Sequence, residues 1–366
     1  MNNSKLVRGA LLVALALALQ SAPPPLETQA VSPPPTPEQI MAIPDGLRAS
    51  FRREVIDATR FPEARLQKLV AFVFDEGKLG IEYKADATLT VAESYAQRKV
   101  NCLSSTLLIV ALAREAGLSA EGQEIDRILG WGAIGETVVQ SRHANAIVRA
   151  SDKRKFIIDI DSSDVVATDS LNPVSDQTLF AAFYGNRSIE LMVAGRLAEA
   201  KVWLDTALQY APDSPSLLNN AGVLSMRLAD ATAAERYFHA ALAQDREMMG
   251  AVANLVAFYK KQGDAAKAAA WQGRADKLLR KDPYYQFSLG LQLEQAGDLA
   301  GAMRQYRRAV SLNREEHRFH FGLARVHFKL GQLRKADAEL ARAEDLSEGP
   351  RRDQYQAKLA ALRRLR

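Results

Sequence analysis

The sequence predicts two folded parts, an α+β domain followed by an all-α solenoid built from helix pairs. A length of 366 residues exceeds what a single hydrophobic core usually organises. The first half mixes helical apolar spacing with short β-branched runs, whereas the second half repeats one pattern every 34 residues. Because 48% of the residues are hydrophobic and 25% are charged, the composition is that of a globular protein and does not predict a largely disordered chain.

The chain opens with a segment typical of an export signal. Lys5 and Arg8 precede an apolar run at residues 10–19, which is too short for a stable bilayer-spanning helix but has the length of a signal-peptide core. Small residues predict cleavage after Ala30, so residues 1–30 are expected to be a signal peptide and the protein to be exported, periplasmic or secreted. The alternative is an uncleaved segment that anchors the protein.

A proline-rich linker follows the signal. Seven of the fourteen prolines lie between Pro23 and Pro37, and a segment of this kind cannot build a core. Residues 31–37 are therefore expected to be an extended tether that leads into the first domain.

The α+β domain is expected over residues 38–176. Its stretch at 65–79 has helical apolar spacing. The stretches at 142–150 and 155–161 are short and rich in β-branched residues, and a polar turn separates them. Helices followed by a strand pair indicate an α+β domain in which the strands form the second layer.

The second half repeats with a period of 34 residues, and every repeat has a break in its helical pattern. The residues at these turn positions are Gly195, Ala229, Gly263, Gly297 and Gly331. Five positions later stand Ala200, Ala234, Ala268, Ala302 and Ala336, and twelve positions later stand Ala207, Ala241, Ala275, Ala309 and Ala343. Small residues allow antiparallel helices to approach closely, so each repeat is expected to be a helix pair.

Larger residues stand nine positions after the turn in four repeats: Leu204, Phe238, Tyr306 and Leu340. The third repeat departs from this pattern with Gln272, and Pro212 is the only proline in the expected closing register. With these positions, residues 181–350 resemble a tetratricopeptide array of five repeats, and residues 351–366 are expected to form the capping helix that such a stack requires.

An asparagine recurs nine residues before the turn position in the first three repeats, as Asn186, Asn220 and Asn254. An amide both donates and accepts hydrogen bonds, so a row of amides along the first helices would suit an extended peptide backbone. The row resembles the asparagine ladders of peptide-binding tetratricopeptide proteins, which implies a protein or peptide partner. The alternative is that each amide bonds a neighbouring helix.

Cys102 is the only cysteine, and it immediately precedes a helix that is apolar on nearly every side. Asn101 is predicted to cap this helix, which leaves the thiol in a first turn where unpaired N–H groups and the helix dipole favour a thiolate. One cysteine cannot make an intramolecular disulfide. The thiol is therefore interpreted either as a nucleophile or as a small apolar side chain in the core.

A nucleophilic thiol needs a base, and His143 is the only histidine outside the repeats. Asp159 and Asp161 follow on the neighbouring predicted strand and share one of its faces. In this order the segments resemble the transglutaminase-like fold of the papain-like superclass over residues 38–176. The resemblance implies Cys102 as nucleophile, His143 as general base and acid, and Asp159 as the orienting carboxylate, with Asp161 as the alternative.

The sequence thus predicts a papain-like/transglutaminase-like α+β domain followed by a tetratricopeptide solenoid. The first functional hypothesis is an exported cysteine acyl-transfer enzyme, of protease, amidase or transglutaminase type, whose array recruits a protein or peptide substrate. The alternative is a non-catalytic tetratricopeptide adaptor or scaffold with a degenerate transglutaminase-like domain.

The sequence gives little indication of a cofactor, a metal ion, a nucleic-acid partner or membrane contact. There is no metal or nucleotide motif, so no cofactor and no metal site are expected. The net charge of +5 comes from cations that are interleaved with acids, and no nucleic-acid partner is expected. The basic segment at 351–366 leaves peripheral contact with an anionic membrane surface as a third hypothesis.

Overall fold

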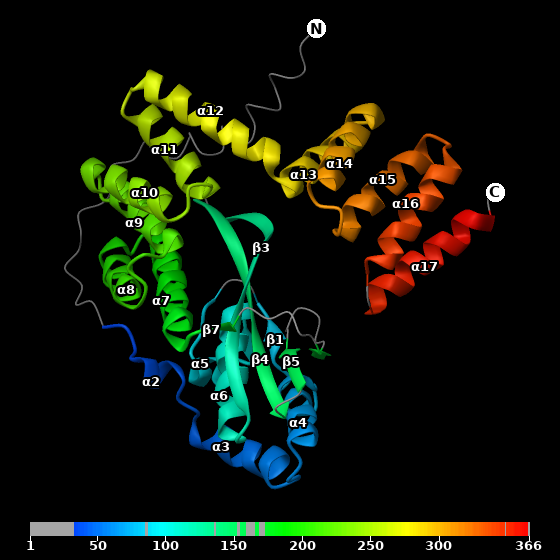
Figure 1. Ribbon diagram of the computed structural model, residues 1–366. Coiled ribbons are helices and arrows are strands. Elements are labelled where there is room, and N and C mark those ends of the chain that lie inside the picture. Colours follow the sequence, from blue (N-terminus) through cyan, green and yellow to red (C-terminus); the bar gives the residue numbers. More distant parts are fainter. Residues whose placement is uncertain are drawn as a thin grey trace. The chain divides into compact units, whose positions relative to one another are not determined.

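The computed structural model forms two compact units, the first ending at Gly263 and the second beginning at Asp264 (Figure 1). This division falls in the turn of the third predicted helix pair. The predicted signal peptide lies outside the described residues. The residues that the structure describes are 33–84, 87–134, 137–151, 154–158, 165–167, 173–347 and 349–364.

Short helices lead into the first unit, and their ends follow from local capping. The side chain of Thr36 caps α2 in a capping box with Gln39, and Thr90 caps α5 in the same way with Glu93. Pro62 occupies the first turn of α4, where its missing N–H costs nothing. The helical segments are α2 (Pro37–Ile40), α3 (Asp45–Phe51), the π-helical η1 (Arg52–Ile56), α4 (Pro62–Phe74) and α5 (Val91–Gln97).

A five-stranded antiparallel sheet has the order β6-β5-β4-β3-β7. The predicted strand pair is present, since β4 and β5 pair with Ala146 opposite Ile158. The long partner of β4, β3, was not predicted. The strands are β3 (Ser119–Ile134), β4 (Thr137–Ser151), β5 (Arg154–Ile158), β6 (Val165–Ala167) and β7 (Pro173–Val174), beside a short parallel pair of β1 (Glu82–Tyr83) and β2 (Lys99–Val100).

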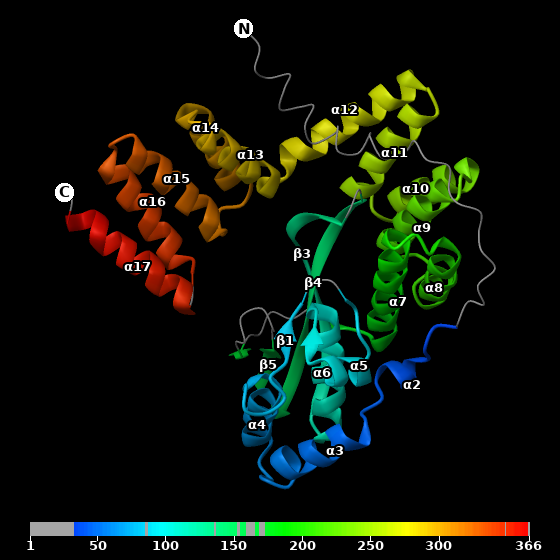
Figure 2. The same cartoon turned by 180° about the vertical axis from the view of Figure 1, so that it is seen from behind.

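Helix α6 (Cys102–Glu115) packs against β4 and β3 (Figure 2). The small side chains of Ala120 and Ala146, together with Val148, belong to the same hydrophobic core as α6 and are almost fully buried. They allow the helix to lie close to the strands. The first unit therefore contains an α+β layer, as expected, although no observation on it establishes a papain-like or transglutaminase-like fold.

The helix-pair repeat is confirmed. All five turn residues have positive φ, from 60° at Ala229 to 81° at Gly297, and each one ends the first helix of its pair. The first unit contains α7 (Asp176–Val193), α8 (Leu197–Tyr210), α9 (Pro215–Arg227), α10 (Ala231–Gln244) and α11 (Met249–Lys261). The second unit contains α12 (Ala265–Lys281), α13 (Pro283–Gln295), α14 (Leu299–Leu312), α15 (His317–Lys329), α16 (Leu333–Asp345) and α17 (Gly349–Arg364).

The alanines of the repeat are buried between the helices, as their size predicts. Two glycines that were not predicted to be part of the repeat, Gly222 and Gly290, allow the two helices of a pair to approach even more closely. A Cβ atom on Gly222 would lie 2.4 Å from the ring of Phe238, and one on Gly290 would lie 2.5 Å from the ring of Tyr306. Each glycine thus accepts the aromatic ring of the second helix of its own pair.

One hydrophobic core runs through the first unit from the N-terminal helices to the repeats. It includes Phe51 of α3, Leu107 of α6, Val148 of β4, Phe183 of α7 and Leu217 of α9. The compact units therefore do not divide near residue 176, where the sequence pattern changes, because the first two helix pairs complete the core of the α+β layer.

The cap predicted after the last repeat is present as α17. Its Tyr355, Leu359 and Leu362 are buried and pack in one cluster with Leu340 of α16. In the described part of the chain, no helix combines the length and the apolar character needed to cross a membrane.

Candidate functional site

Cys102 lies half-buried in the first turn of α6, and the predicted cap is confirmed. The side-chain oxygen of Asn101 accepts a hydrogen bond from the backbone N–H of Ser104 at 2.8 Å. The amide nitrogen of Asn101 donates to the hydroxyl of Thr88 at 3.0 Å, and the hydroxyl of Ser104 accepts from the N–H of Leu89 at 2.7 Å. The helix start is therefore fixed by a buried network of neutral hydrogen bonds.

This network continues into the first repeat helix. Glu190 of α7 accepts a hydrogen bond from the backbone N–H of Thr88 at 2.8 Å and forms an ion pair with Arg187 at 2.9 Å. Burial raises the pKa of the Glu190 carboxyl and outweighs the opposite effects of these two partners. The sequence pattern gives no indication that Glu190 joins this network, because its partner Thr88 is 102 residues away in the chain.

The described part of the structure does not test the remaining residues of the predicted triad. The backbone of His143 lies in β4, where it pairs with Ile125, and β4 packs against α6. The side chain of His143 lies outside the described part of the structure, as do Asp159 and Asp161 altogether. The catalytic assignment stays a prediction.

Two amide side chains on the sheet are buried, and the sequence did not predict them as site residues. Gln123 of β3 pairs with Asn145 of β4, and the side-chain oxygen of each has no hydrogen-bond partner among the described residues. A polar residue in a strand is normally expected to face solvent, so composition alone gives no signal for such a pair.

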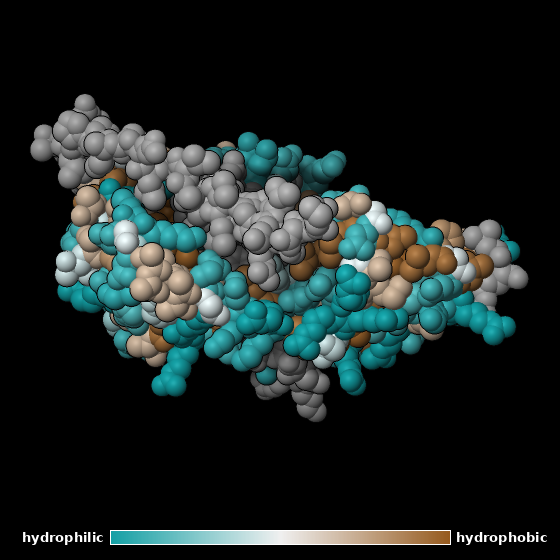
Figure 3. All heavy atoms as spheres, turned by 90° about the horizontal axis from the view of Figure 1, so that it is seen from above, coloured by the Kyte–Doolittle hydropathy of each residue, from teal (hydrophilic) through white to brown (hydrophobic). Residues whose placement is uncertain are grey.

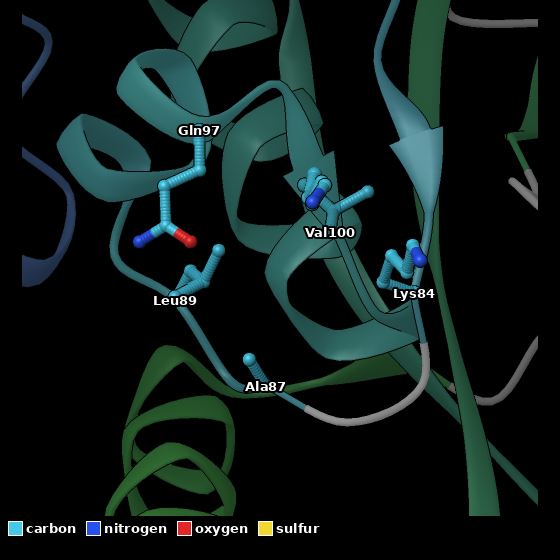
Figure 4. Close-up of a pocket in the computed structure, with 6 residues that line it drawn as sticks. Lys84, Ala87, Leu89, Gln97 and Val100 are labelled. Carbon is cyan, nitrogen blue, oxygen red and sulfur yellow. The ribbon is translucent and has the colours of Figure 1, made fainter.

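A small cavity lies next to the start of α6 (Figure 4). Its volume is about 170 Å³, below the several hundred Å³ of typical ligand pockets. Leu89 and Val100 are buried, whereas Lys84 and Lys99 are exposed. The lining residues are Lys84, Ala87, Leu89, Gln97, Lys99 and Val100. A cavity of this size has room for water or a small ion but not for a peptide substrate.

The predicted asparagine row lies on the first helices of the pairs in the first unit. Asn186 of α7, Asn220 of α9 and Asn254 of α11 are all half-buried. The amide of Asn254 donates to the side-chain oxygen of Asn219 on α9 at 2.8 Å, so the alternative expectation of a bond to a neighbouring helix holds for Asn254. Asn219 was missed, although it directly precedes Asn220 in the sequence.

The second unit carries a cluster of charges around Glu294, whose side chain is only 6% exposed. Its carboxylate accepts hydrogen bonds from Arg325 at 2.6 Å and Tyr306 at 2.7 Å and pairs with Lys329 at 2.9 Å. Burial alone would raise the pKa of Glu294, but these three donors lower it to about 2. The carboxylate therefore stays charged at neutral pH and holds two cations in place.

Glu316 forms a second cluster of the same kind. Its side chain is 6% exposed and accepts hydrogen bonds from Arg318 at 2.8 Å and 3.0 Å and from Tyr284 at 3.1 Å. Burial raises the pKa of Glu316, but the Arg318 contacts outweigh this and bring it to about 2. Sequence spacing did not predict either cluster, because Arg325 and Lys329 reach Glu294 from the next helix pair and Tyr284 reaches Glu316 across 32 residues of the chain.

No protein-family model and no curated protein matches the chain. The solved structures with similarity include a thermophilic tetratricopeptide-repeat protein of Thermus thermophilus (18% identity, 50% of this chain, 98% of that chain, TM-score 0.26). PilF of Pseudomonas aeruginosa is 20% identical and covers 51% of this chain and 86% of its own, with a TM-score of 0.28. YrrB, described as a tetratricopeptide-repeat protein with an unusual peptide-binding site, is 20% identical and covers 49% of this chain and 92% of its own, with a TM-score of 0.26. These TM-scores are low, so the tetratricopeptide character of the chain rests on its own period and packing.

Proposed function

We propose that this protein is an adaptor that binds a protein or peptide partner through the first helices of its helix pairs. The observation that carries the proposal is the row of half-buried amides Asn186, Asn220 and Asn254 on α7, α9 and α11, of which Asn254 also bonds Asn219 of the preceding helix pair. That bond orients both amides, and it leaves the oxygen of Asn254 and the amide nitrogen of Asn219 to engage other groups. Oriented amides lose little freedom when a peptide backbone binds.

The α+β layer has a structural role in this account. It shares one hydrophobic core with the first two helix pairs, and the Glu190–Thr88 bond ties it to α7. The layer therefore closes the N-terminal end of the stack, where a solenoid needs a cap. The export predicted from residues 1–30 would place this adaptor in the periplasm or outside the cell.

Site-specific photo-crosslinking in cells tests the proposal. A photoreactive amino acid replaces Asn220 on α9, and the matched control carries it at Arg236, an exposed residue of α10. The adaptor account expects one or a few discrete adducts from position 220 and none of these from position 236. Identical adducts from both positions, or none from position 220, would contradict it.

Acyl transfer by Cys102 is the second candidate function. The observation in its favour is that α6, which begins at the half-buried Cys102, packs against the strand that contains His143. A thiolate would attack an amide or ester carbonyl, expel the amine or alcohol, and leave a thioester that water or a second amine resolves. Labelling by iodoacetamide at mildly acidic pH tests it, since a thiolate paired with His143 reacts well below the ordinary thiol pKa and His143→Ala would remove that excess.

A further inference from the structure

A stripe of cations and aromatic rings runs along α15 in the second unit. The α15 stripe consists of Arg318, Phe321, Arg325, Phe328 and Lys329, which recur at the spacing of one helix face. These five residues are half-buried or exposed, whereas all the remaining residues from 319 to 327 are buried. Phe328 is 49% exposed, which is unusual for a ring of this size. Apolar side chains gather in brown patches beside polar ones over the last helices of this unit (Figure 3).

The three cations of the α15 stripe are held in fixed positions. Glu294 binds Arg325 and Lys329, and Glu316 binds Arg318. The cations nevertheless remain accessible, since the side chains of Arg318, Arg325 and Lys329 are 39%, 33% and 49% exposed. Much of the rotamer entropy of these side chains is therefore already lost on folding, which lowers the cost of binding an anion.

The aromatic rings lie between the cations. The guanidinium of Arg325 is 5.2 Å from the ring centroid of Phe321, and the ammonium group of Lys358 on α17 lies 4.6 Å from the same centroid. Three cations thus contact the two carboxylates, and Lys358 adds a fourth cation beside Phe321. The excess charge favours an anionic ligand, and the rings offer apolar contact next to it.

The excess of positive charge in the chain lies in the second unit, which carries the α15 stripe. Residues 264–366 contain 21 Lys and Arg against 13 Asp and Glu, whereas residues 1–263 contain 27 against 30. The second unit therefore has a net charge of +8 within a chain of +5. A field of this sign attracts acidic partners over distances up to about one Debye length, roughly 8 Å at physiological salt.

We propose that the α15 stripe binds an acidic peptide segment of a partner protein, whose carboxylates pair with Arg318, Arg325 and Lys329 and whose apolar side chains contact Phe321 and Phe328. This inference rests on the proposed function, because it names the partner chemistry for the same repeat array. Cations fixed at separate positions between rings suit carboxylates at defined spacings, whereas the headgroups of a fluid membrane have no such spacing.

The helix geometry sets the spacing of the acidic residues. Arg318 and Arg325 are separated by about 10.5 Å along the axis of α15, and Arg325 and Lys329 by about 6 Å. Side chains of an extended peptide share one face only at even spacings, which cover about 7 Å in two residues and about 13 Å in four. The matching segment therefore has acidic residues at positions i, i+4 and i+6 and an apolar residue at i+2, all on the face that meets the stripe, and the long side chains of arginine and glutamate cover the remaining difference in length.

Fluorescence anisotropy with the full chain tests this inference. The probe is a fluorescein-labelled, end-blocked peptide with glutamate at its fourth, eighth and tenth positions, phenylalanine at its sixth, and glycine and serine elsewhere. A second probe has glutamine at the three glutamate positions. The protein variants are Lys329→Gln and Phe328→Ala, both at exposed positions, and the matched control is Lys335→Gln on α16, which removes the same charge from an exposed residue away from the stripe.

The inference expects the glutamate peptide to bind, the glutamine peptide to bind at least tenfold more weakly, and each stripe variant to weaken binding by about tenfold. Lys335→Gln should change the affinity by less than about twofold, because it alters only the long-range charge. Equal weakening by Lys329→Gln and Lys335→Gln would overturn the inference in favour of unspecific attraction. Absence of binding would overturn it as well.

A membrane surface is a separate outcome of the same experiment. Binding of the chain to vesicles of phosphatidylglycerol that is lost in Lys329→Gln, without binding of the glutamate peptide, would overturn the peptide inference in favour of a lipid ligand. Failure here is distinguishable from failure of the proposed function, because the crosslinks from Asn220 probe the first unit. Discrete adducts at position 220 with no binding of the glutamate peptide would reject the α15 stripe alone.

Discussion

The carboxylate of Glu190 on α7 accepts a hydrogen bond from the backbone N–H of Thr88, with an N···O distance of 2.8 Å. Thr88 in turn accepts from Asn101, the cap of α6. The first repeat helix is thereby joined to the start of the helix that packs on the sheet. The connection adds to the shared hydrophobic core that joins the α+β layer and the first repeats in one compact unit.

Glu190 makes this connection dependent on pH. Its raised pKa means that the folded protein binds the proton more tightly than the unfolded chain. The contribution is complete below the ordinary pKa near 4.5 and is lost as the pH rises through the raised value. Glu190→Gln keeps an acceptor for Thr88 and removes the titration, so its free energy of unfolding should fall less between about pH 5 and about pH 8 than that of the wild type.

Urea unfolding at these pH values measures the effect. Asp205→Asn on α8 is the matched control, because that carboxylate is 51% exposed and its pair with Lys201 lies within one helix. An unchanged pH dependence in Glu190→Gln would show that this carboxyl does not titrate as its burial requires.

Ala229 is the one turn residue of the five that is not glycine, although its φ is +60°. A side chain in the left-handed region costs about 1 kcal/mol, which glycine avoids. Ala229→Gly should therefore raise the free energy of unfolding of the first unit by about 0.5–1 kcal/mol. Gly195→Ala, at the equivalent turn with φ of 77°, should lower it by a similar amount. Urea unfolding followed by circular dichroism checks both, and a loss of stability in Ala229→Gly would contradict the turn assignment.

Glu294 should stabilise the second unit at neutral pH. Glu294→Gln leaves Arg325 and Lys329 without their shared anion, and we expect a loss of about 2 kcal/mol in the protection of α13 and α15 against hydrogen exchange. Since the pKa of Glu294 is lowered to about 2, its contribution is present above the ordinary pKa of 4.5 and is lost as the pH falls towards 2. The control is Glu315→Gln, at a carboxylate that is 71% exposed and should change protection little. Equal effects from both substitutions would reject the cluster as a stabilising element.

The adaptor account makes a plain prediction for Cys102. Cys102→Ala should bind the partner captured at Asn220 with wild-type affinity, and iodoacetamide should label Cys102 at about pH 6 no faster in the wild type than in His143→Ala. An enzyme that holds its substrate as a thioester would instead lose the acyl product on residue 102 in Cys102→Ala. Rapid labelling at about pH 6 that disappears in His143→Ala would favour acyl transfer over the adaptor.

The repeat could be predicted because its signals are local. Turn residues such as Gly297, and alanines such as Ala302, recur at fixed intervals, and their small size directly determines how closely helices pack. The cap at Asn101 is local as well. For the same reason the pair β4 and β5 was visible, since only a short turn separates the two strands.

What could not be predicted depends on residues that are distant in the chain. The partner of Glu190 is 102 residues away, and Arg325 reaches Glu294 across 31 residues. No period in the sequence records such contacts. The inclusion of the first helix pairs in the first unit was equally invisible, because it depends on a core that the α+β layer shares with α7 and α9.

The most direct test of the central claim is the affinity of the partner captured at position 220 for the wild-type chain and for Asn220→Ala. The account predicts a dissociation constant about fivefold to tenfold larger for Asn220→Ala, with an unchanged melting temperature, because a half-buried amide loses its bonds to the partner. Arg236→Ala, on the exposed face of α10, should bind as the wild type does. Equal affinity of Asn220→Ala and the wild type would contradict the claim that the first helices of the repeats form the binding surface.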